Sequence, residues 1–498
     1  MNLDSSSPSF WIILGTAIHL LCFFAISIHA LRRRRNSSAT ILWISLAWFL
    51  PFLGPLLYLS FGIDRVPEKG LIKQTTNQFF GDHRQKRHDS TDPFIAWHFN
   101  HAVHLAEIEN PLIKQLNLLV DKIITDHPLI NGNQITPLLC GDEAYPEMLE
   151  AIRNAKHHIH LQSFIIAKDR VGKDLLELLK KKAESGVQVR LLFDRFGSAP
   201  AYFKGLFRKY KNIKNFEIAG WTQANILKRQ FQVNLRNHRK NLIIDGQIAF
   251  FGGVNIAKEN LSDAQQPAIR DYHFKVIGPL IHELQYSFLR DWFFITDAPI
   301  GTLLCAEYFP KTQTSGNVKA RLIDSGPSKA YGLLGEVFFN AIILAQTQIL
   351  VVTPYFVPTP DILKALESAA RRGVDVRIIL PEKNNHRYAG QASRALYEEL
   401  LIAGVRIFER KPPFIHAKAM LVDDCIAVVG TANLDIRSLE LNYETTVLIN
   451  DEPTANKIKY NIHEELEHSC EIHLNDWLDR PFIQKLSENL SILLAPIL

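Results

Sequence analysis

The stretches HRKNLIIDGQIAFFGGVN, beginning at His238, and HAKAMLVDDCIAVVGTAN, beginning at His416, repeat one spaced pattern. In each stretch a His is followed two residues later by Lys and five residues after that by Asp. The matched positions are His238, Lys240, Asp245, Gly252 and Asn255 in the first copy and His416, Lys418, Asp423, Gly430 and Asn433 in the second. The same spacing recurring 178 residues later indicates an internal duplication.

The chain around each stretch alternates between strand and helix patterns. LLELLKKKAESG has helical periodicity, stops at Gly186 and is followed by the apolar strand VQVRLLFD. LKALESAARRG stops at Gly373 and is followed by VDVRIILP, so the repeat is larger than the motif. We therefore predict an α/β fold of two similar α/β/α halves that face each other, with their boundary near residues 300 to 320.

The composition is that of a globular protein, and one basic run suits an anionic partner. Hydrophobic residues make up 47% of the 498 residues and charged residues 21%, which excludes disorder as the main state. The net charge is only +5, but Lys204 to Lys240 holds ten Lys or Arg against one acid, Glu217. Either a solvated basic face or an anion-binding face explains this run. Aromatic residues within it favour a membrane interface beside anionic headgroups.

The five cysteines are scattered along the chain, at Cys22, Cys140, Cys305, Cys425 and Cys470. They show neither the close pairs of zinc sites nor those of redox dithiols. We expect no disulfide framework, no metal and no cofactor.

The first 62 residues have the pattern of a membrane anchor. Phe10 to Leu31 and Ala39 to Gly62 are 22 and 24 residues long without a formal charge, and each is long enough to cross about 30 Å of hydrocarbon. Asp4 and the lack of Lys or Arg before the first span argue against a cleaved signal peptide. We predict two transmembrane helices, the second kinked by Pro51 and Pro55, in a multi-pass membrane protein.

The basic cluster Arg32 to Arg35 leaves two topologies open. Positive loops stay on the cytoplasmic side, so two full spans send the rest of the chain outward. A re-entrant second segment instead leaves the rest of the chain inside.

The organisation expected from these patterns has four parts. Residues 1–62 form the anchor, and 63–110 form a linker that becomes helical around FIAWHFNHAVHLAEIENP. Residues 111–300 and 301–498 form the two halves. The carboxy-terminal segment FIQKLSENLSILLAPIL is amphipathic; we expect it to dock on the core, with membrane contact as the alternative.

The duplicated motif supplies groups for phosphoryl chemistry without a metal. On an extended strand His238 and Lys240 project from the same face, as do His416 and Lys418. Two His, two Lys and the amides of Asn255 and Asn433 make an anion pocket in which one neutral His attacks phosphorus and the other, protonated, donates to the leaving oxygen. The six motif residues His238, Lys240, Asp245, His416, Lys418 and Asp423 form the candidate catalytic set.

Strand geometry gives the motif aspartates a different place within that set. Asp245 and Asp423 follow their histidines by seven residues, which puts them on the opposite face or in the turn. We expect them to hold the hairpin rather than take part in the chemistry.

These residues resemble the phospholipase D superfamily, which is marked by a duplicated H-x-K-x-x-x-x-D motif. The strings NLRNHRKNLIIDG, RDYHF, TPYFVP and GTANLDIRSLELNYE and the paired membrane segments resemble the bacterial cardiolipin synthases more closely. The resemblance implies a phosphatidyl-histidine intermediate and the conversion of two phosphatidylglycerols into cardiolipin and glycerol. It also implies that His238 is the nucleophile and His416 the acid, and that Asp271 and Glu444 orient the histidines. Gly253 and Thr431 depart from the Ser that many members have.

Three alternatives remain beside this hypothesis. Water in place of the acceptor hydroxyl makes the same site a phospholipid hydrolase. A superfamily nuclease accepts other phosphodiesters, although the membrane segments argue against a nucleic-acid partner. In a non-catalytic membrane scaffold, the two intact motifs would have no function. Oligomeric state and acyl-chain preference are left open by the sequence.

Overall fold

The computed structural model describes residues 8–32, 37–59, 66–89, 101–221, 224–225, 230–231, 235–327 and 332–493. The chain divides into two compact units, Met1–Glu68 and Lys69–Leu498.

The first unit contains α1 (Pro8–Arg32), α2 (Ser37–Phe49) and α3 (Leu53–Leu57). Within the described residues, Phe10–Arg32 is the one helical segment long and apolar enough to cross a membrane, with a mean hydropathy of 2.2. The predicted second span is interrupted near Pro51, where a kink was predicted, and α2 itself has 13 residues and covers only about 20 Å. Pro51 has no amide hydrogen to donate to the preceding turn, and Phe52 then takes a φ of 63°.

The second unit begins inside α4 (Val66–Asp89), a helix that lies in the region predicted as a linker. Phe80 of α4 is fully buried and packs on Tyr286 with ring centroids 5.3 Å apart. Of the helix predicted around residues 94–111, residues 94–100 lie outside the described part. The described remainder before Pro111 has one 3₁₀ turn, Leu105–Glu107.

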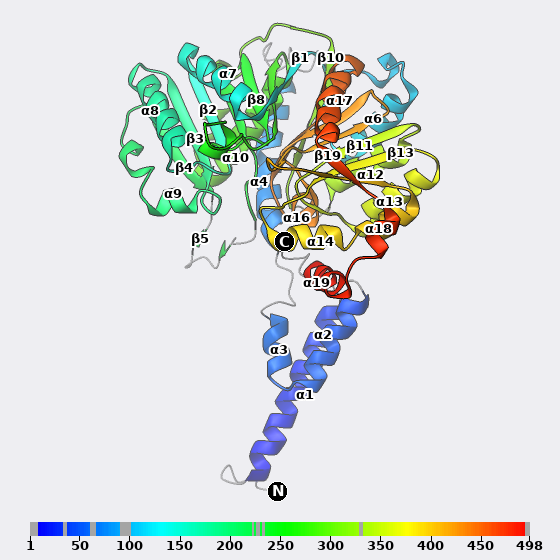
Figure 1. Cartoon of the computed structure of the whole chain (residues 1–498). Helices are drawn as coiled ribbons and strands as arrows, with labels where there is room; N and C mark the ends of the chain where they lie inside the picture. The colour runs from blue at the N-terminus through cyan, green and yellow to red at the C-terminus, as the bar shows by residue number, and fades with distance from the viewer. Residues whose placement is uncertain are drawn as a thin grey trace. The chain divides into compact units, whose positions relative to one another are not determined.

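Fifteen strands of the described residues form one sheet that runs through both halves (Figure 1). From the centre outward, the first half contributes β1 (Ile130–Leu139), β9 (Tyr272–Ile277), β8 (Ile248–Gly252), β7 (Asn241–Ile244), β2 (His158–Ser163), β3 (Gln188–Asp194) and β4 (Phe216–Trp221). The second half contributes β10 (Val318–Ser325), β18 (Glu444–Asn450), β16 (Ile426–Gly430), β15 (Ala419–Val422), β11 (Gln348–Val352), β13 (Asp375–Pro381), β14 (Arg406–Arg410) and β19 (Ser469–Ile472).

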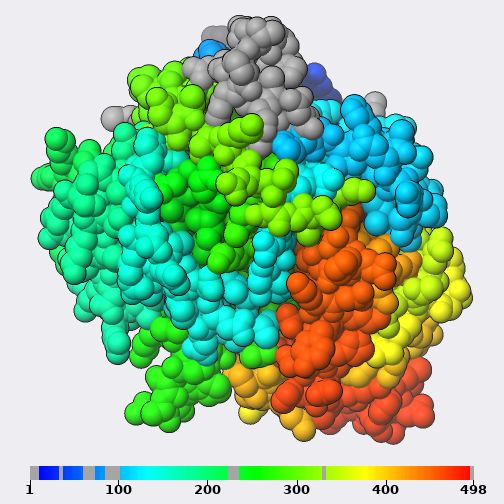
Figure 2. Space-filling view, turned by 90° about the horizontal axis from the view of Figure 1, so that it is seen from above, coloured from blue at the N-terminus to red at the C-terminus, as the bar shows by residue number. Residues whose placement is uncertain are grey.

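The two lists repeat the same pattern of strand directions, which confirms the predicted duplication. In each half the four inner pairings are antiparallel and the next two are parallel. The halves join where β1 pairs antiparallel with β10, Ile130 opposite Ala320. Seen from above, the cyan-to-green first half and the yellow-to-red second half lie side by side (Figure 2).

Helices cover the sheet in matching positions. The main ones are α7 (Cys140–Asn154), α8 (Arg170–Glu184) and α10 (Leu280–Thr296) in the first half, and α12 (Leu333–Leu344), α13 (Pro360–Arg371) and α17 (Glu452–Glu467) in the second. The predicted helix stops are confirmed, since α8 and α13 end two residues before Gly186 and Gly373, whose φ angles are 99° and 92°. Each half has its own apolar core.

The described residues contain further α-helices and short strands. They are α6 (Pro111–Ile123), α9 (Ala199–Phe203), α11 (Ile300–Leu303), α14 (Arg387–Arg394), α15 (Tyr397–Ala403), α16 (Ile436–Glu440), α18 (Leu474–Leu478), α19 (Phe482–Ile492), β5 (Ala224–Asn225) paired with β6 (Gln230–Phe231), and β12 (Phe356–Val357) paired with β17 (Leu434–Asp435).

The aromatic residues of the basic run mostly do not face outward as predicted. Phe207, Tyr210, Phe216 and Trp221 of this run are each at most 3% exposed, because they pack in the interior, whereas Phe203, just before the run, is 79% exposed. Lys228 and Arg229 of the run lie outside the described residues.

Candidate active site

The two motif histidines lie in extended segments immediately before β7 and β15, and both line one cavity of about 600 Å³. Each segment is hydrogen-bonded to the opposite half. The His238 amide donates to the Tyr443 carbonyl at 2.9 Å, and the His416 amide donates to the Arg270 carbonyl at 2.7 Å. The halves therefore meet along the two motif segments, which brings the two histidines to one site.

The same backbone pairing sets a crossed arrangement of histidines and carboxylates. Glu444, next to Tyr443, accepts from His238 Nδ1 at 2.9 Å, and Asp271, next to Arg270, accepts from His416 Nδ1 at 2.7 Å. Both carboxylates are buried, with 0% and 1% exposure. Each histidine is thus oriented by a carboxylate of the other half.

The charge states in this site follow from burial and from these pairs. Burial lowers the pKa of His416 to about 4, with Lys418 acting in the same direction, and burial also lowers the pKa of His238 against the pull of Glu444. Burial would raise the pKa of Asp271, but Lys418 and His416 outweigh it and hold the pKa below its usual value. An ionised carboxylate only accepts, so Nδ1 carries the proton and the Nε2 lone pair of each neutral imidazole is free to react.

The pKa of Glu444, like that of Asp271, is lower than usual although the side chain is buried. Burial would raise its pKa, but His238 and Lys240 together with the hydrogen bonds that it accepts hold the pKa below the usual value. Those bonds come from Thr431 Oγ1 at 2.5 Å and Asn442 Nδ2 at 3.1 Å as well as from His238. The carboxylate is therefore fixed on three sides.

The motif lysines are buried beside the histidines that they follow. Lys240 Nζ donates to the His238 carbonyl at 2.7 Å, and Lys418 Nζ donates to the His416 carbonyl. Burial lowers the pKa of Lys240 to about 7 and that of Lys418 to about 8. An anion entering the cavity favours the charged form of both lysines, so ligand charge and lysine protonation are coupled.

The room for Asp271 is provided by a missing side chain. A Cβ built on Gly253 would lie 1.9 Å from Asp271 Oδ1, inside any permitted contact. At the matching position of the second half, Thr431 has a side chain that hydrogen-bonds Glu444. The two departures from Ser noted in the sequence therefore fit two carboxylates of different length.

Asn255 and Asn433 also line the cavity. Asn255 Oδ1 accepts from the Ile165 amide at 3.3 Å, which orients the side-chain NH₂ group. Asn433 Oδ1 is buried and has no hydrogen-bond partner among the described residues.

Asp245 and Asp423 do not line the cavity that holds the histidines. Asp245 accepts from the amides of Lys156, His157 and His158 at 2.7 to 2.9 Å. Asp423 accepts in the same way from the amides of Gln346, Thr347 and Gln348, which lead into β11. Although they belong to the motif, we assign both residues to the hairpin rather than to the chemistry.

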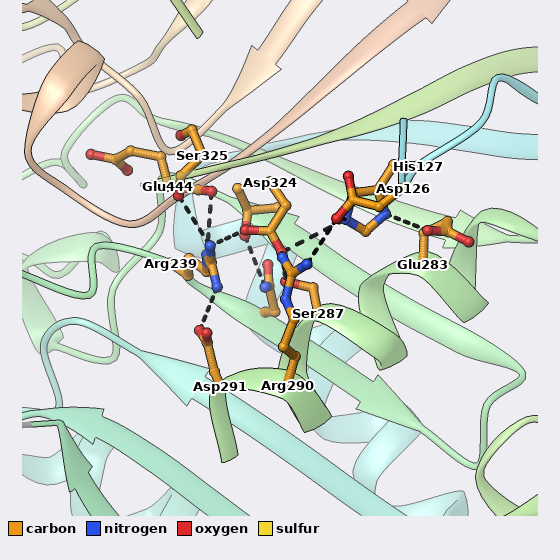
Figure 3. Close-up of polar contacts among 12 residues, drawn as sticks. Asp126, His127, Arg239, Glu283, Ser287, Arg290, Asp291, Asp324, Ser325 and Glu444 are labelled. Atoms are coloured by element: carbon orange, nitrogen blue, oxygen red, sulfur yellow. Dashed lines mark hydrogen bonds and ion pairs between the residues drawn. The ribbon is translucent and has the colours of Figure 1, made fainter. Parts of the chain in front are cut away.

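Sequence reasoning missed Arg239, the middle residue of the first His-x-Lys. Its Nε donates to the Glu444 carbonyl at 3.2 Å, and its guanidinium pairs with Asp291 of α10 and Asp324 of β10 (Figure 3). Lys73 of α4 pairs with Asp291 at 2.9 Å, and Asn237 Nδ2 donates to the same carboxylate at 3.0 Å. These contacts hold the motif segment and Glu444 in one place.

The ionic network continues behind the site. Arg290 pairs with Asp324 and with Asp126, and His127 contacts Glu283 (Figure 3). Arg84 also pairs with Glu283. The acids inside the apolar runs FLRDWFF and VKARLIDS are the one sequence signal for this network. Within the described residues, no three His, Cys, Asp or Glu side chains are grouped so as to hold a metal ion.

Comparison with known families shows which proteins this chain is similar to. The family described as "Cardiolipin synthase, PLD-like domain" matches residues 148–292 and 338–467, each of which contains one copy of the motif. The chain belongs to the cardiolipin synthase family. A second family, "Phospholipase_D-nuclease N-terminal", matches residues 21–62.

Relatives of this family align along nearly all of the chain. A cardiolipin synthase A of Pseudomonas putida is 33% identical over 499 residues and covers 100% of both chains. A cardiolipin synthase of Geobacillus thermodenitrificans is 32% identical over 472 residues, covering 93% of this chain and 90% of that protein. The crystal structure of a phosphatidylserine synthase of Haemophilus influenzae shares the fold, with a TM-score of 0.58 and 16% identity over 76% of this chain and 97% of that chain.

Proposed function

We propose that this chain transfers a phosphatidyl group from one phosphatidylglycerol to a second, giving cardiolipin and glycerol. The observation that carries the proposal is the pair of crossed His–carboxylate contacts facing one cavity. The family membership supports it, since the relatives that match the whole chain are named cardiolipin synthases.

In the first step, Nε2 of His238 attacks the phosphorus of the donor lipid. The new P–N bond forms as the bond from phosphorus to the glycerol oxygen breaks, and protonated His416 gives its proton to that oxygen. In the second step His416 takes the proton of the acceptor's hydroxyl, whose oxygen attacks phosphorus while the P–N bond breaks. Two phosphatidylglycerols are consumed, cardiolipin and one glycerol are released, and both histidines return to their starting protonation states.

The buried cations and amides serve the charged transition state. We assign Lys240, Lys418, Asn255 and Asn433 as donors to the non-bridging oxygens: the two asparagines line the cavity, and the two lysines are buried beside the histidines. One preorganised donor of this kind is worth about 3 kcal/mol. Since His416 is neutral near pH 7 in the empty site, the anionic lipid itself supplies the field that favours its protonated, acidic form.

The cavity wall suits an amphiphilic anion. It combines the aromatic rings of Phe164, Phe196 and Phe414 with the guanidinium groups of Arg236 and Arg437. The runner-up is a phospholipase D-type hydrolase, in which water replaces the acceptor hydroxyl at the same intermediate.

Purified protein given phosphatidylglycerol labelled in the headgroup and in the acyl chains tests the proposal. Labelled cardiolipin with one free glycerol per cardiolipin supports transfer, whereas phosphatidic acid alone supports hydrolysis. Acyl label bound to protein in acid-labile form, present in the parent and absent in His238→Ala, supports the assigned nucleophile. Label that disappears only in His416→Ala reverses the two roles.

The proposed location is the bacterial plasma membrane, with the catalytic unit on the cytoplasmic side. The shortness of α2 and the break at Pro51 favour a re-entrant second segment over a full span. With Arg32 to Arg35 on the cytoplasmic side, that segment returns the chain to the same side. Protease added to right-side-out vesicles should leave the carboxy-terminal unit intact; its digestion would instead support two full spans.

A further inference from the structure

Helix α19 (Phe482–Ile492) presents an apolar face outward. Phe482, Ile483, Leu486 and Leu490 are 75%, 79%, 46% and 56% exposed, and Leu493 just beyond the helix is 73% exposed. Their spacing places them along one side of the helix. The five residues that follow in the sequence, LAPIL, are apolar as well.

The opposite, polar face of α19 is the face that docks on the protein. Glu488 is 2% exposed and accepts from Arg480 at 2.8 Å and from Arg394 at 3.1 Å. Ser491 Oγ donates to Gln391 Oε1 at 2.9 Å, and Gln391 Nε2 donates to Ser487 Oγ at 3.1 Å. A helix on the surface of a soluble protein normally does the reverse, burying its apolar stripe and exposing its polar one. The expected docking on the core is therefore present, but through the polar side.

The helix under α19 also forms part of the active-site cavity. Gln391 and Arg394 of α14 (Arg387–Arg394) hold α19, while Arg387, Tyr388 and Ala389 of the same helix line the cavity with both histidines. Tyr388 is 61% exposed at this rim, and an amphipathic ring beside an Arg is typical of membrane interfaces. The apolar face of α19 is thus connected to the cavity rim through one short helix.

We propose that the exposed face of α19 is an interfacial membrane-binding surface, lying in the plane of the bilayer at the boundary of headgroups and acyl chains. A lipid bilayer fits this surface better than a protein partner, because the apolar stripe is one continuous helix face and the chain already carries an apolar helix long enough to cross a membrane. In this position α19 holds the rim of the active-site cavity at the bilayer surface, from which the lipid substrate enters. That delivery role rests on the proposed function, whereas the contact with the bilayer does not.

The contact is tested by depth-dependent quenching in the full chain. Single cysteines at Ile483→Cys and Leu490→Cys carry an environment-sensitive fluorophore, with Tyr460→Cys on α17, 67% exposed, as the matched control. The background replaces Cys22, Cys305 and Cys470, the three cysteines that are not buried, by Ser. The protein is placed in phosphatidylglycerol-containing nanodiscs with nitroxide-labelled lipid.

Quenching several-fold stronger at positions 483 and 490 than at 460 supports the proposal. Equal quenching at all three positions overturns it. Energy transfer between labels on two copies, without lipid quenching, assigns the face to a second copy and overturns it too.

A second experiment separates membrane docking from catalysis. The variant Ile483→Ser/Leu486→Ser/Leu490→Ser should lose roughly tenfold or more of its rate on phosphatidylglycerol in vesicles and keep its rate on short-chain, monomeric phosphatidylglycerol. Leu118→Ser/Ile402→Ser, which removes apolar side chains exposed elsewhere, should change neither rate. Equal loss on both substrates, or no loss on vesicles, overturns the delivery role. If the parent forms no product from either lipid, the proposed function fails while the quenching result still stands.

Discussion

The substitution Gly253→Ala should inactivate His416, although the added methyl group does not contact that histidine. The Cβ of Gly253→Ala would lie 1.9 Å from Asp271 Oδ1 and 2.5 Å from its Cγ. The neighbouring strand is hydrogen-bonded, since the Gly253 amide donates to the Tyr272 carbonyl at 2.9 Å, so the carboxylate is the group that must move. Relief of the contact takes a shift of about 1 Å or more.

That shift is enough to break the contact that orients His416. The bond from His416 Nδ1 to Asp271 Oδ2 is 2.7 Å long, and about 1 Å of added length leaves no hydrogen bond. Misplacement of this size costs about 10²-fold in rate, and loss of the orienting carboxylate in a hydrolase triad costs about 10⁴-fold. We therefore expect kcat to fall by about 10² to 10⁴, with KM nearly unchanged because the phosphate-binding groups stay in place.

The assay is turnover of phosphatidylglycerol at saturating concentration, with the thermal midpoint measured on the same preparation. Gly335→Ala on α12, where a Cβ meets nothing within 4 Å, is the matched control and should keep full turnover. Thr431→Ala removes one hydrogen bond to Glu444 but leaves two, so its loss should be about tenfold. A Gly253→Ala protein that is stably folded and turns over within twofold of the parent would refute the reasoning.

Other predictions concern stability, pH and the ionic network. Asp423→Ala should lower the free energy of unfolding by about 2 to 3 kcal/mol, because the three amides that lead into β11 lose their acceptor, while kcat of the folded protein changes less than about twofold; urea unfolding and turnover check both. Burial raises the pKa of Asp435 to about 6 from the usual 3.8, so the folded state keeps a proton that the unfolded state releases, and stability falls as pH rises through this window. The free energy of unfolding of Asp435→Asn, relative to that of the parent, should therefore be higher by about 1 to 3 kcal/mol at pH 8 than at pH 4. The same change in unfolding free energy between pH 4 and pH 8 in both proteins would contradict this. Arg239→Lys keeps the charge but not the fork that reaches Glu444, so kcat should fall at least tenfold with little change in KM; a change confined to KM would count against positioning.

The duplicated fold was predictable because its signals are local. The spacing of His, Lys and Asp, the glycines that end α8 and α13, and the turn at Asp245 each act within a few residues of chain. Strand geometry alone also predicts that Asp245 and Asp423 lie away from the histidines. Such features can be predicted from a single sequence because steric rules that act over a few residues determine them.

The crossed carboxylates could not be predicted in the same way. Asp271 and Glu444 were identified by resemblance, but which histidine each one orients depends on how the halves meet. That is decided by two backbone bridges, Asn237 with Tyr443 and Arg270 with Ile415, between segments far apart in sequence. Arg239 was missed for the same reason, because its partners come from three distant elements.

Periodicity likewise revealed that α19 is amphipathic but not which face it buries. The pattern of Phe482, Ile483, Leu486 and Leu490 is the same whether the apolar side meets a core or a lipid surface. The choice is made by Arg394 and Arg480, which bind Glu488 and so draw the polar side inward. Hydropathy alone overstated the length of the second apolar helix, whereas the predicted kink at Pro51 is where the helix breaks.

The crossed contacts also explain why both copies of the motif stay intact. The proposed reaction needs both histidines, and a His–carboxylate pair within each half would let each half orient its own histidine independently. Here His238 relies on Glu444 and His416 on Asp271, so a change in either half disables a histidine of the other. The continuous sheet through β1 and β10 fixes the distance between the halves to the accuracy that two hydrogen bonds of 2.7 to 2.9 Å demand. Duplication has therefore produced one site whose parts are inseparable, and the network around Arg239 braces it from behind.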